Sequence, residues 1–472
     1  MARSFFILYT LSRRRVSDQL RSLFFIPTAL ALTTSLFILF YISSTSNLFS
    51  PHPNRPSHSL HHILQYPDAV SSNVDNFHTL IESQTKESLE FDFLNNNINN
   101  NNLEGVEDVG GDGEMLWRLN GKTAVDEIIF HDQDIFKQDY LKMNKSFKIF
   151  MYPHNKNDPF ANVLLPVDFE PEGNYASESF FKKTLNNSHF LTNDPSKADL
   201  FYLPFSIARL RHDPRVGIDG IQDFIKDYIY NVSHFYPYWN RTGGADHFYV
   251  SCHSIGRFAI NKAEEIKLNV IQVVCSSSYF QSAYVPHKDA SLPQIWPRVD
   301  DDPPRITSTQ RKKLAFFAGS INSPVRQKLV ETWQNDTSMS VHSGHLHTSY
   351  EEALQDSKFC LHVKGFEVNT ARIGDALFHG CVPVIIANYY DLPFADILNW
   401  KSFSIVIATL DIPLLQRILR SLSDEEYASL HKNVLEVRKH FRWHVTPVDY
   451  DAFYMVMYEL WLRRSAIRVP LS

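Results

Sequence analysis

The chain has 472 residues, of which 44% are hydrophobic and 13% aromatic, and its formal net charge at pH 7 is −6. This length allows two or three domains, and the composition is ample for sizeable hydrophobic cores. The acidic balance excludes the general basic character of a nucleic-acid-binding protein, so we expect no nucleic-acid partner. Four cysteines indicate no disulfide scaffold, although isolated bridges are possible.

Residues 23–42 contain no charged side chain and are long enough to cross a bilayer core of about 30 Å. Arginines precede this segment at positions 13, 14, 15 and 21, whereas the next positive residue after it is Arg55. The positive-inside rule therefore predicts a cytosolic tail over 1–22, a signal anchor over 23–42 and a luminal remainder. A cleaved signal peptide is the alternative, but its apolar region spans only about 7–15 residues.

Residues 43–143 show little hydrophobic periodicity. A Pro/Ser/His-rich stretch follows the apolar segment, and residues 95–103 have the low-complexity sequence NNNINNNNL. Such segments cannot bury enough apolar surface to offset the entropy of ordering, so we expect a largely disordered luminal stem. A helix or two within residues 123–143 would lead into the folded part.

From residue 144 onward, apolar strands alternate with helical segments. In the first half we expect strands over 147–152, 198–203, 247–252 and 270–275 and helices over 177–185 and 223–231. In the second half we expect strands over 314–318, 359–363, 381–387 and 404–407 and helices over 325–334 and 371–379. The alternation predicts an α/β fold with two Rossmann-like domains facing a cleft, over 144–300 and 301–425, joined by linker-like residues 296–308. Helices within 426–472 would pack back on the fold.

The turn after the strand at 359–363 is unusually polar. Lys364 and Gly365 break the strand, Asn369 or Thr370 can cap the following helix, and Gly380 is suited to end that helix. In parallel sheets, ligands bind at the carboxyl ends of strands beside helix N-termini. We therefore predict a nucleotide site built from the polar side chains of this region, Lys364, Glu367, Asn369, Thr370, Arg372 and Asp375.

The motif FCLHVKGFEVNTARIGDALFHGCVPV (359–384) resembles the donor-binding core of the exostosin-like glycosyltransferases, a plant family of Golgi enzymes related to animal heparan-sulfate synthases. The chain departs from many members by having Val363-Lys364 in place of Pro-Ser. The resemblance covers roughly residues 145–425 and implies a GT-B type of fold. It also implies a donor site formed by Gly319, Arg326, Lys364, Gly365, Glu367, Thr370, Arg372 and Asp375.

Each of these donor residues has a physical rationale. Glu367 can accept the ribose hydroxyl protons, as an acidic residue does in dinucleotide folds. Arg326 and Arg372, each near the start of a predicted helix, can contact a diphosphate through their guanidinium forks. Asp375 lies at i+3 from Arg372 and can hold it in place. Alternatively, Glu367, Arg372 and Asp375 form a surface ion-pair cluster that caps the helix.

A second motif, YPYWNRTGGADHFYVSCHSIGR (236–257), matches the family closely through His253, after which many members carry Asp-Trp and this chain has Ser254-Ile255. An inverting transfer needs a base that takes the acceptor hydroxyl proton as the anomeric carbon is attacked. His253, at the carboxyl end of a predicted strand, is one candidate base and Asp246 is the other. Alternatively, Asp246 and His247 form a structural pair.

The sequence offers no convincing metal site. Three D-x-D matches occur, at 132–134, 300–302 and 449–451, and none ends a strand inside either half. A His cluster at 342, 345 and 347 is typical of a Ser/Gly-rich surface. The resemblance implies that cationic side chains and helix ends replace a divalent ion, so we expect no cofactor and no essential metal.

The cysteines fall into two pairs. Cys252 and Cys275 end consecutive predicted strands, whereas Cys360 and Cys381 begin consecutive ones, and an oxidising lumen would permit a bridge in each pair. Four buried free thiols fit equally well. Five glycosylation sequons all lie on the predicted luminal side, at Asn144, Asn186, Asn231, Asn240 and Asn335.

The resemblance implies a single-pass type II membrane protein of the Golgi apparatus with a luminal catalytic domain. It would transfer a hexose or pentose, with inversion, from a nucleotide sugar, expected to be UDP-linked, to a cell-wall polysaccharide or glycoprotein glycan. Its partners would be the nucleotide sugar, the glycan acceptor, the Golgi membrane and other glycosyltransferases. The alternative is an inactive relative that scaffolds a polysaccharide synthase complex. A glycoside hydrolase would instead need a carboxylate pair about 5–10 Å apart.

Overall fold

The structure is a computed structural model that describes residues 129–166, 173, 175–280, 284–298, 302–304, 306–344, 346 and 348–464. The predicted cytosolic tail, signal anchor and most of the predicted stem lie outside these residues. None of the helices among the described residues combines the length and the hydrophobicity that a membrane crossing requires.

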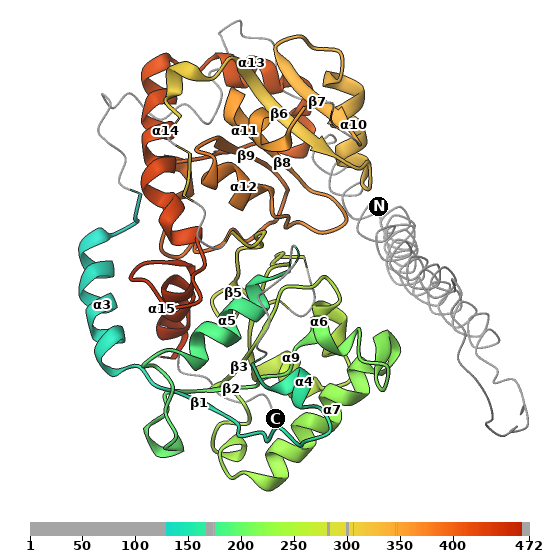
Figure 1. Ribbon diagram of the computed structural model, residues 1–472, viewed down its shortest axis with the longest axis vertical. Coiled ribbons are helices and arrows are strands. Elements are labelled where there is room, and N and C mark those ends of the chain that lie inside the picture. Colours follow the sequence, from blue (N-terminus) through green and yellow to red (C-terminus); the bar gives the residue numbers. More distant parts are fainter. Residues whose placement is uncertain are drawn as a thin grey trace, which may run out of the picture. The chain divides into compact units, whose positions relative to one another are not determined.

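The first half is built on a five-stranded parallel sheet whose strands follow chain order (Figure 1). Its strands are β1 Ile149–Met151, β2 Leu200–Tyr202, β3 His247–Ser251, β4 Ile271–Val274 and β5 Ala290–Ser291. Its helices are α4 Ala161–Leu164, α5 Ser177–Asn186, α6 Ile207–Leu210, α7 Gly217–Phe235, α8 Gly256–Ala259 and α9 Glu264–Asn269. All residues of β2, β3 and β4 are buried, which explains their continuous apolar and aromatic runs.

The second half is also built on a five-stranded parallel sheet, but its strand order is β10-β9-β8-β6-β7. Its strands are β6 Lys313–Gly319, β7 Met339–Ser343, β8 Ser357–Val363, β9 Val382–Ile386 and β10 Ile405–Val406. Its helices are α10 Pro324–Trp333, α11 Tyr350–Asp356, α12 Arg372–Phe378, α13 Leu415–Arg420 and α14 Asp424–Val437. The two sheets confirm the predicted parallel α/β class.

The order of the second sheet reverses at β6. The chain runs from β6 to β7 on one side and then returns to β8 on the other side of β6. Such a reversal leaves a crevice at the carboxyl ends of the two diverging strands, and ligands of open α/β sheets bind there. Gly319 ends β6 and Val363 ends β8, so the predicted nucleotide turn begins at this crevice.

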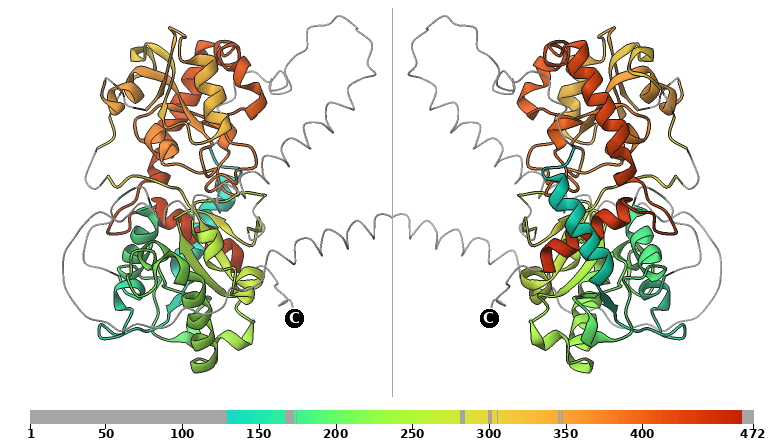
Figure 2. Two further views of the ribbon diagram at one scale, coloured as in Figure 1. Left: turned by 90° about the vertical axis from the view of Figure 1, so that its right-hand side faces the viewer. Right: turned by 90° about the vertical axis from the view of Figure 1, so that its left-hand side faces the viewer.

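Two terminal helices complete the folded part. Helix α15, Ala452–Arg464, contacts α5 and β5 of the first half, and helix α3, Gln133–Ser146, lies beside α15 (Figure 2). Aromatic rings form the α3–α15 contact, in which Phe136 meets Tyr458 and Tyr140 meets Tyr454. Helix α3 overlaps the helical segment that the sequence predicts within residues 123–143, and these buried rings attach it to the fold.

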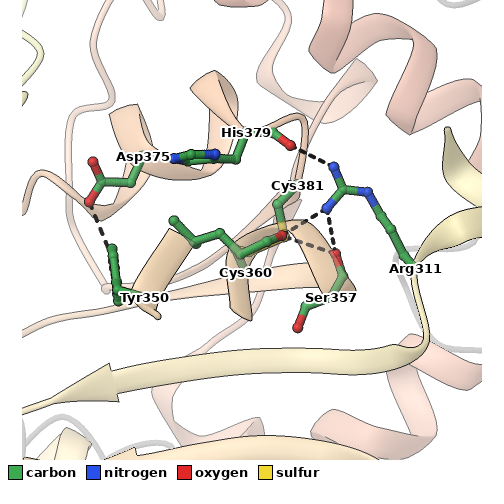
Figure 3. Close-up of a disulfide and its surroundings, with 8 residues drawn as sticks. Arg311, Tyr350, Ser357, Cys360, Asp375, His379 and Cys381 are labelled. Carbon is green, nitrogen blue, oxygen red and sulfur yellow. Dashed lines mark hydrogen bonds between the residues drawn. A yellow bond between two sulfur atoms is a disulfide. The ribbon is translucent and has the colours of Figure 1, made fainter. Parts of the chain in front are cut away.

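The structure contains both disulfides that the sequence pairs, Cys252–Cys275 and Cys360–Cys381. The first joins the carboxyl ends of β3 and β4. The second joins β8 to the residue before β9, beneath helix α12 (Figure 3). Helix α12 ends just before Gly380, which has a φ of 67°, in the left-handed region that favours glycine. The Cys360–Cys381 disulfide ties the chain just after α12 to β8, and the turn at Gly380 ends the helix. Together they restrict the movement of α12 relative to β8.

Candidate functional site

A cavity of about 560 Å³ lies between the two halves, which is within the size range of ligand pockets. The first half contributes Tyr175, Ser254, Gln294 and Trp296 to its wall. The second half contributes Asn322, Arg326, Tyr350, Gly365, Phe366, Glu367, Asn369, Thr370, Ala371, Arg372 and Asp375. Of the eight predicted donor residues, the structure thus brings six to one cavity, at the crevice where the second sheet reverses.

Two arginines at this cavity are held by main-chain carbonyl and amide oxygens. The Arg326 guanidinium donates to Val363 O at 3.2 Å, to Ser320 O at 3.2 Å and to Asn322 Oδ1 at 2.8 Å. Arg372 donates from Nη2 to Ala318 O at 2.8 Å. Within the described part of the chain, neither arginine forms an ion pair with a carboxylate. Burial and then the charge of Arg372 lower the pKa of Arg326 to about 10.

The positions of the two guanidinium groups require two glycines. A Cβ at Gly319 would lie 2.3 Å from Nη2 of Arg372, and a Cβ at Gly365 would lie 2.7 Å from Nη2 of Arg326. Both contacts are shorter than real Cβ atoms show, so any larger residue would displace the guanidinium group. Gly319 and Gly365 therefore contribute space to the site, although Gly319 itself is not part of the cavity wall.

A hydrogen-bond relay fixes the turn between β8 and α12. The pKa of His362 is lowered to about 3, mainly by burial, so the ring is neutral and its Nε2 donates to Val368 O at 2.8 Å. Its Nδ1 then accepts from the Thr370 hydroxyl, and the Thr370 oxygen accepts from the backbone N–H of Arg372 at 3.3 Å. Thr370, rather than Asn369, therefore satisfies the first N–H group of α12.

Two side chains of this turn form direct hydrogen bonds with the first half. Glu367, only 9% exposed, accepts a hydrogen bond from the Ser276 hydroxyl at 2.6 Å. Asn369 donates to Gln294 Oε1 at 2.6 Å. Both partners follow strands of the first sheet, Ser276 after β4 and Gln294 after β5. The turn is thus shared between the halves, which a helix-capping ion-pair cluster would not require.

Two predicted donor residues are placed differently from the prediction. Asp375 does not hold Arg372; it accepts from Arg298 Nη2 at 2.7 Å and from the Tyr350 hydroxyl at 3.3 Å. Arg372 instead turns toward Ala318 O, which lies close because Gly319 has no side chain. Lys364 is not part of the cavity wall; its backbone N–H donates to Ile386 O, and its carbonyl oxygen accepts from the Ser323 hydroxyl.

His253 lies behind the cavity wall at the carboxyl end of β3. Its ring is 8% exposed and lies under that of Tyr175, with ring centroids 4.5 Å apart, and Tyr175 and Ser254 form the wall in front of it. Nε2 lies 2.8 Å from Nη1 of Arg211, and Nδ1 lies 3.1 Å from the backbone N of Ile255. Burial, Arg211 and His212 lower the pKa of His253 to about 4, so the ring is neutral at pH 7, as a base must be.

Asp246 lies at the opposite end of β3, roughly 23 Å of extended chain from His253. Its carboxylate accepts from Arg241 Nε at 2.6 Å and from the Thr242 hydroxyl at 2.6 Å, and it contacts Nδ1 of His247 at 2.7 Å. Burial tends to raise the pKa of Asp246, but His247, Thr242 and Arg241 outweigh it and lower the pKa. This geometry fits the structural-pair alternative, and Asp246 does not line the cavity.

The glycosylation sequons differ in accessibility. Asn186, Asn231, Asn240 and Asn335 are exposed, whereas Asn144 lies partly buried in α3 with its Oδ1 atom enclosed. Glycosylation requires a surface asparagine, so the first four are the better acceptors.

No three His, Cys, Asp or Glu side chains of the described residues come together as a metal site. Asp132 and Asp449 of the D-x-D matches have structural contacts, with the start of α3 and with Tyr140.

Comparison with known proteins shows the family of the chain. The Exostosin GT47 domain matches residues 143–422. The chain belongs to the Exostosin GT47 family. It is thus a glycosyltransferase, as its curated relatives are named. "Probable glycosyltransferase At5g03795" of Arabidopsis thaliana is 36% identical over 354 residues, which cover 72% of this chain and 66% of that protein.

Two further relatives extend the comparison. "Probable glycosyltransferase At5g25310" of Arabidopsis thaliana is 33% identical over 353 residues, 72% of each chain. "Probable glucuronosyltransferase GUT1" of Oryza sativa subsp. japonica is 30% identical over 275 residues, 53% of this chain and 65% of that protein. Among solved structures, "Crystal Structure of TarM" aligns at 10% identity with a TM-score of 0.27, over 48% of this chain and 57% of that chain.

Several residues of this GT47 cavity were missed by the sequence reasoning. Tyr175, Gln294, Trp296 and Tyr350 lie outside the two motifs, and each reaches the cavity through tertiary packing. For the segment after β5, the alternation of side chains along an extended chain was a local signal that could have placed Gln294 and Trp296 on the same side. Successive side chains of an extended segment point to opposite sides, so Gln294 and Trp296 face the cavity together while Ile295 packs against Gly374 of α12.

Proposed function

We propose that this GT47 protein transfers a sugar from a UDP-linked donor to a hydroxyl of a glycan, with inversion and without an essential metal ion. The observation that carries the proposal is the pair of arginines at the reversal of the second sheet. Burying a guanidinium without a carboxylate is costly, and a second cation nearby raises that cost. A diphosphate supplies the missing negative charge and accepts two parallel hydrogen bonds from a guanidinium fork.

The same arginines supply the chemistry that a metal ion supplies elsewhere. In the transfer, the acceptor oxygen bonds to the anomeric carbon, the bond from that carbon to the UDP oxygen breaks, and negative charge develops on the leaving diphosphate. Arg326 and Arg372 are already in place to stabilise that charge, and preorganised charge stabilisation is commonly the largest catalytic term. The acceptor proton passes to a base, and His253 is the base that we propose.

The rest of the donor is assigned from the turn and its surroundings. In this proposal the Glu367 carboxylate accepts hydrogen bonds from the ribose hydroxyl groups. The six-membered base and the sugar occupy the remaining cavity. The rice relatives are named probable glucuronosyltransferases, so UDP-glucuronate is the first donor to test. The chain is further proposed to act as a type II membrane protein of the Golgi apparatus, on a cell-wall polysaccharide or a glycoprotein glycan.

A panel of UDP sugars tests this function directly. The purified full-length protein should release UDP from one of them in the presence of a glycan mixture, at equal rates with EDTA and with Mn²⁺. A rate that EDTA abolishes would overturn the metal-independent mechanism. UDP binding without turnover of any donor would favour the scaffold alternative, in which the donor site is kept but transfer is lost.

A further inference from the structure

Arg211 is a third arginine beside this site, and it belongs to the first half. It directly follows α6, in the connection after β2, and its side chain is half-buried next to His253. Within the described residues, no carboxylate forms an ion pair with it. In the described part of the chain, the other charged or titratable groups found next to the His253 ring are Tyr175, which lies over it, and His212, which is exposed.

The contact with His253 does not give Arg211 a secure acceptor. A neutral imidazole has one nitrogen with a lone pair and one that carries a proton. Here both nitrogens face N–H donors, Nε2 the Arg211 guanidinium at 2.8 Å and Nδ1 the backbone N–H of Ile255 at 3.1 Å, and the Ser254 hydroxyl lies 3.5 Å from Nδ1. Whichever tautomer the ring adopts, one of these two donors lacks an acceptor. The Ile255 N–H is fixed by the backbone, so Arg211 is the group that can turn to another partner.

We propose that Arg211 binds the carboxylate of an acidic sugar, a uronic acid residue, in the glycan acceptor. The proposal rests on the proposed transferase function. A carboxylate matches the guanidinium fork in geometry and charge, which a neutral sugar hydroxyl does not. The substrates' two anionic groups would then be divided between the halves, the diphosphate at Arg326 and Arg372 and the acceptor carboxylate at Arg211.

Binding of the carboxylate would also release the base. When Arg211 turns to the acceptor, Nε2 of His253 loses its cationic neighbour and becomes available for the acceptor hydroxyl. That proton then passes to Nε2 as the oxygen bonds to the anomeric carbon and UDP leaves. A water molecule carries no carboxylate and would find Nε2 still covered by Arg211. The device therefore favours transfer to an acidic glycan over hydrolysis of the donor.

Two simple glycosides test the proposal without knowledge of the natural acceptor. Methyl β-D-glucuronoside carries a carboxylate where methyl β-D-glucoside carries a hydroxymethyl group, and the two are otherwise identical. Each glycoside is titrated into the full-length protein in the absence of nucleotide, and binding is followed by ligand-observed NMR. We expect the glucuronoside to bind about tenfold more tightly or better, which corresponds to one charge-assisted hydrogen bond. Arg211→Gln should abolish this preference, whereas Arg211→Lys, which keeps the charge, should retain part of it.

Arg372→Gln is the matched control, because it removes a guanidinium from the donor half. It should leave the preference for the glucuronoside intact. A preference that survives Arg211→Gln but disappears in Arg372→Gln places the carboxylate in the donor half and overturns the proposal, as does equal affinity for the two glycosides in the wild type. UDP is titrated separately: a wild-type protein that does not bind UDP refutes the proposed donor site, whatever the glycosides show.

A spectroscopic readout separates a bound carboxylate from a general structural effect. In protein labelled with ¹⁵N at histidine, the glucuronoside should shift the His253 Nε2 resonance and raise the pKa of that ring from about 4 toward its ordinary 6.5, because the Arg211 charge is neutralised. The glucoside should do neither. An unchanged His253 resonance at saturating glucuronoside contradicts the release of the base.

Discussion

Replacing Arg326 with glutamine should weaken UDP binding strongly while it affects the empty protein little. The folded protein lowers the pKa of Arg326 from its ordinary 12.5 to about 10, first through burial and then through the charge of Arg372. One pKa unit corresponds to about 1.4 kcal/mol, so the charged side chain destabilises the empty fold by roughly 3 kcal/mol at neutral pH. Removing the charge offsets much of what is lost with its three hydrogen bonds.

The effect on UDP follows from the contact that is lost. A hydrogen bond to a charged group contributes about 1.5–3 kcal/mol, which corresponds to about 10- to 150-fold in Kd. At a UDP concentration of 100 times the wild-type Kd, binding stabilises the wild type by about 2.7 kcal/mol. A variant with a Kd about 100-fold higher would gain only about 0.4 kcal/mol at the same concentration. The rise in Tm with UDP should therefore nearly disappear.

Arg311 provides the control. It is also 4% exposed and donates to main-chain carbonyls, at Leu354, Ser357 and His379, beside the Cys360–Cys381 bridge (Figure 3). It does not line the cavity, and burial lowers its pKa as it does that of Arg326, although Tyr427 and Asp356 oppose the shift. Arg311→Gln should lower the Tm by several degrees and leave the UDP-induced rise intact. The reasoning is refuted if Arg326→Gln keeps the full UDP-induced rise, or if Arg311→Gln loses it.

Three further predictions follow from the site. Glu367→Ala should weaken UDP about 10- to 150-fold in calorimetry if its carboxylate binds the ribose; unchanged UDP affinity with weaker binding of an intact UDP sugar would move that contact to the transferred sugar. His253→Ala should lower transfer about 10²- to 10⁴-fold with UDP affinity retained, and near-normal turnover would exclude His253 as the base. The Tm should fall steadily when thermal unfolding is followed from pH 7 to pH 4.5. Burial lowers the pKa of several histidines to about 3 or 4 in the folded protein, so between these values and 6.5 the unfolded chain binds more protons than the folded one. A constant Tm would contradict this prediction. The histidines are His253, His362, His379, His431 and His440.

The βαβ unit around the nucleotide turn was predictable because its signals are local. A continuous apolar run, a polar turn and a glycine stop predicted a strand, a helix and a second strand, and β8, α12 and β9 fall within two residues of the expected bounds. Strand β7 was missed, since its sequence MSVHS is short and polar at an edge of the sheet. Without β7 the reversal at β6 could not be inferred, and the strongest geometric argument for a ligand site remained hidden.

The partners of the site residues were less predictable than the residues themselves. The i+3 spacing favoured a bond between Asp375 and Arg372, but Asp375 bonds to Arg298, which is 77 positions away. Ser276 and Gln294 likewise reach the turn from the first sheet. Single-sequence patterns report local geometry, whereas these contacts depend on how two sheets close on each other. Six of the eight residues that the motifs named line one cavity, but the predicted bond between Arg372 and Asp375 is wrong. Their role in binding a donor stays a prediction.

The charges of the fold distinguish structural arginines from those that we assign to substrates. Away from the cavity, several arginines are paired with carboxylates, as in Arg215–Asp213, Arg241–Asp246 and Arg463–Asp396. Arg211, Arg326 and Arg372 lack such a pair among the described residues, and all three lie at or beside one cavity. Arg311 also lacks an ion pair there, but it lies away from the cavity and its guanidinium donates to the carbonyls of Leu354, Ser357 and His379. An unpaired and partly desolvated cation is costly, so three of them at one cavity call for an explanation other than stability. A site that must bind and release anions cannot keep permanent carboxylate partners, and under the functions that we propose this requirement would account for the contrast.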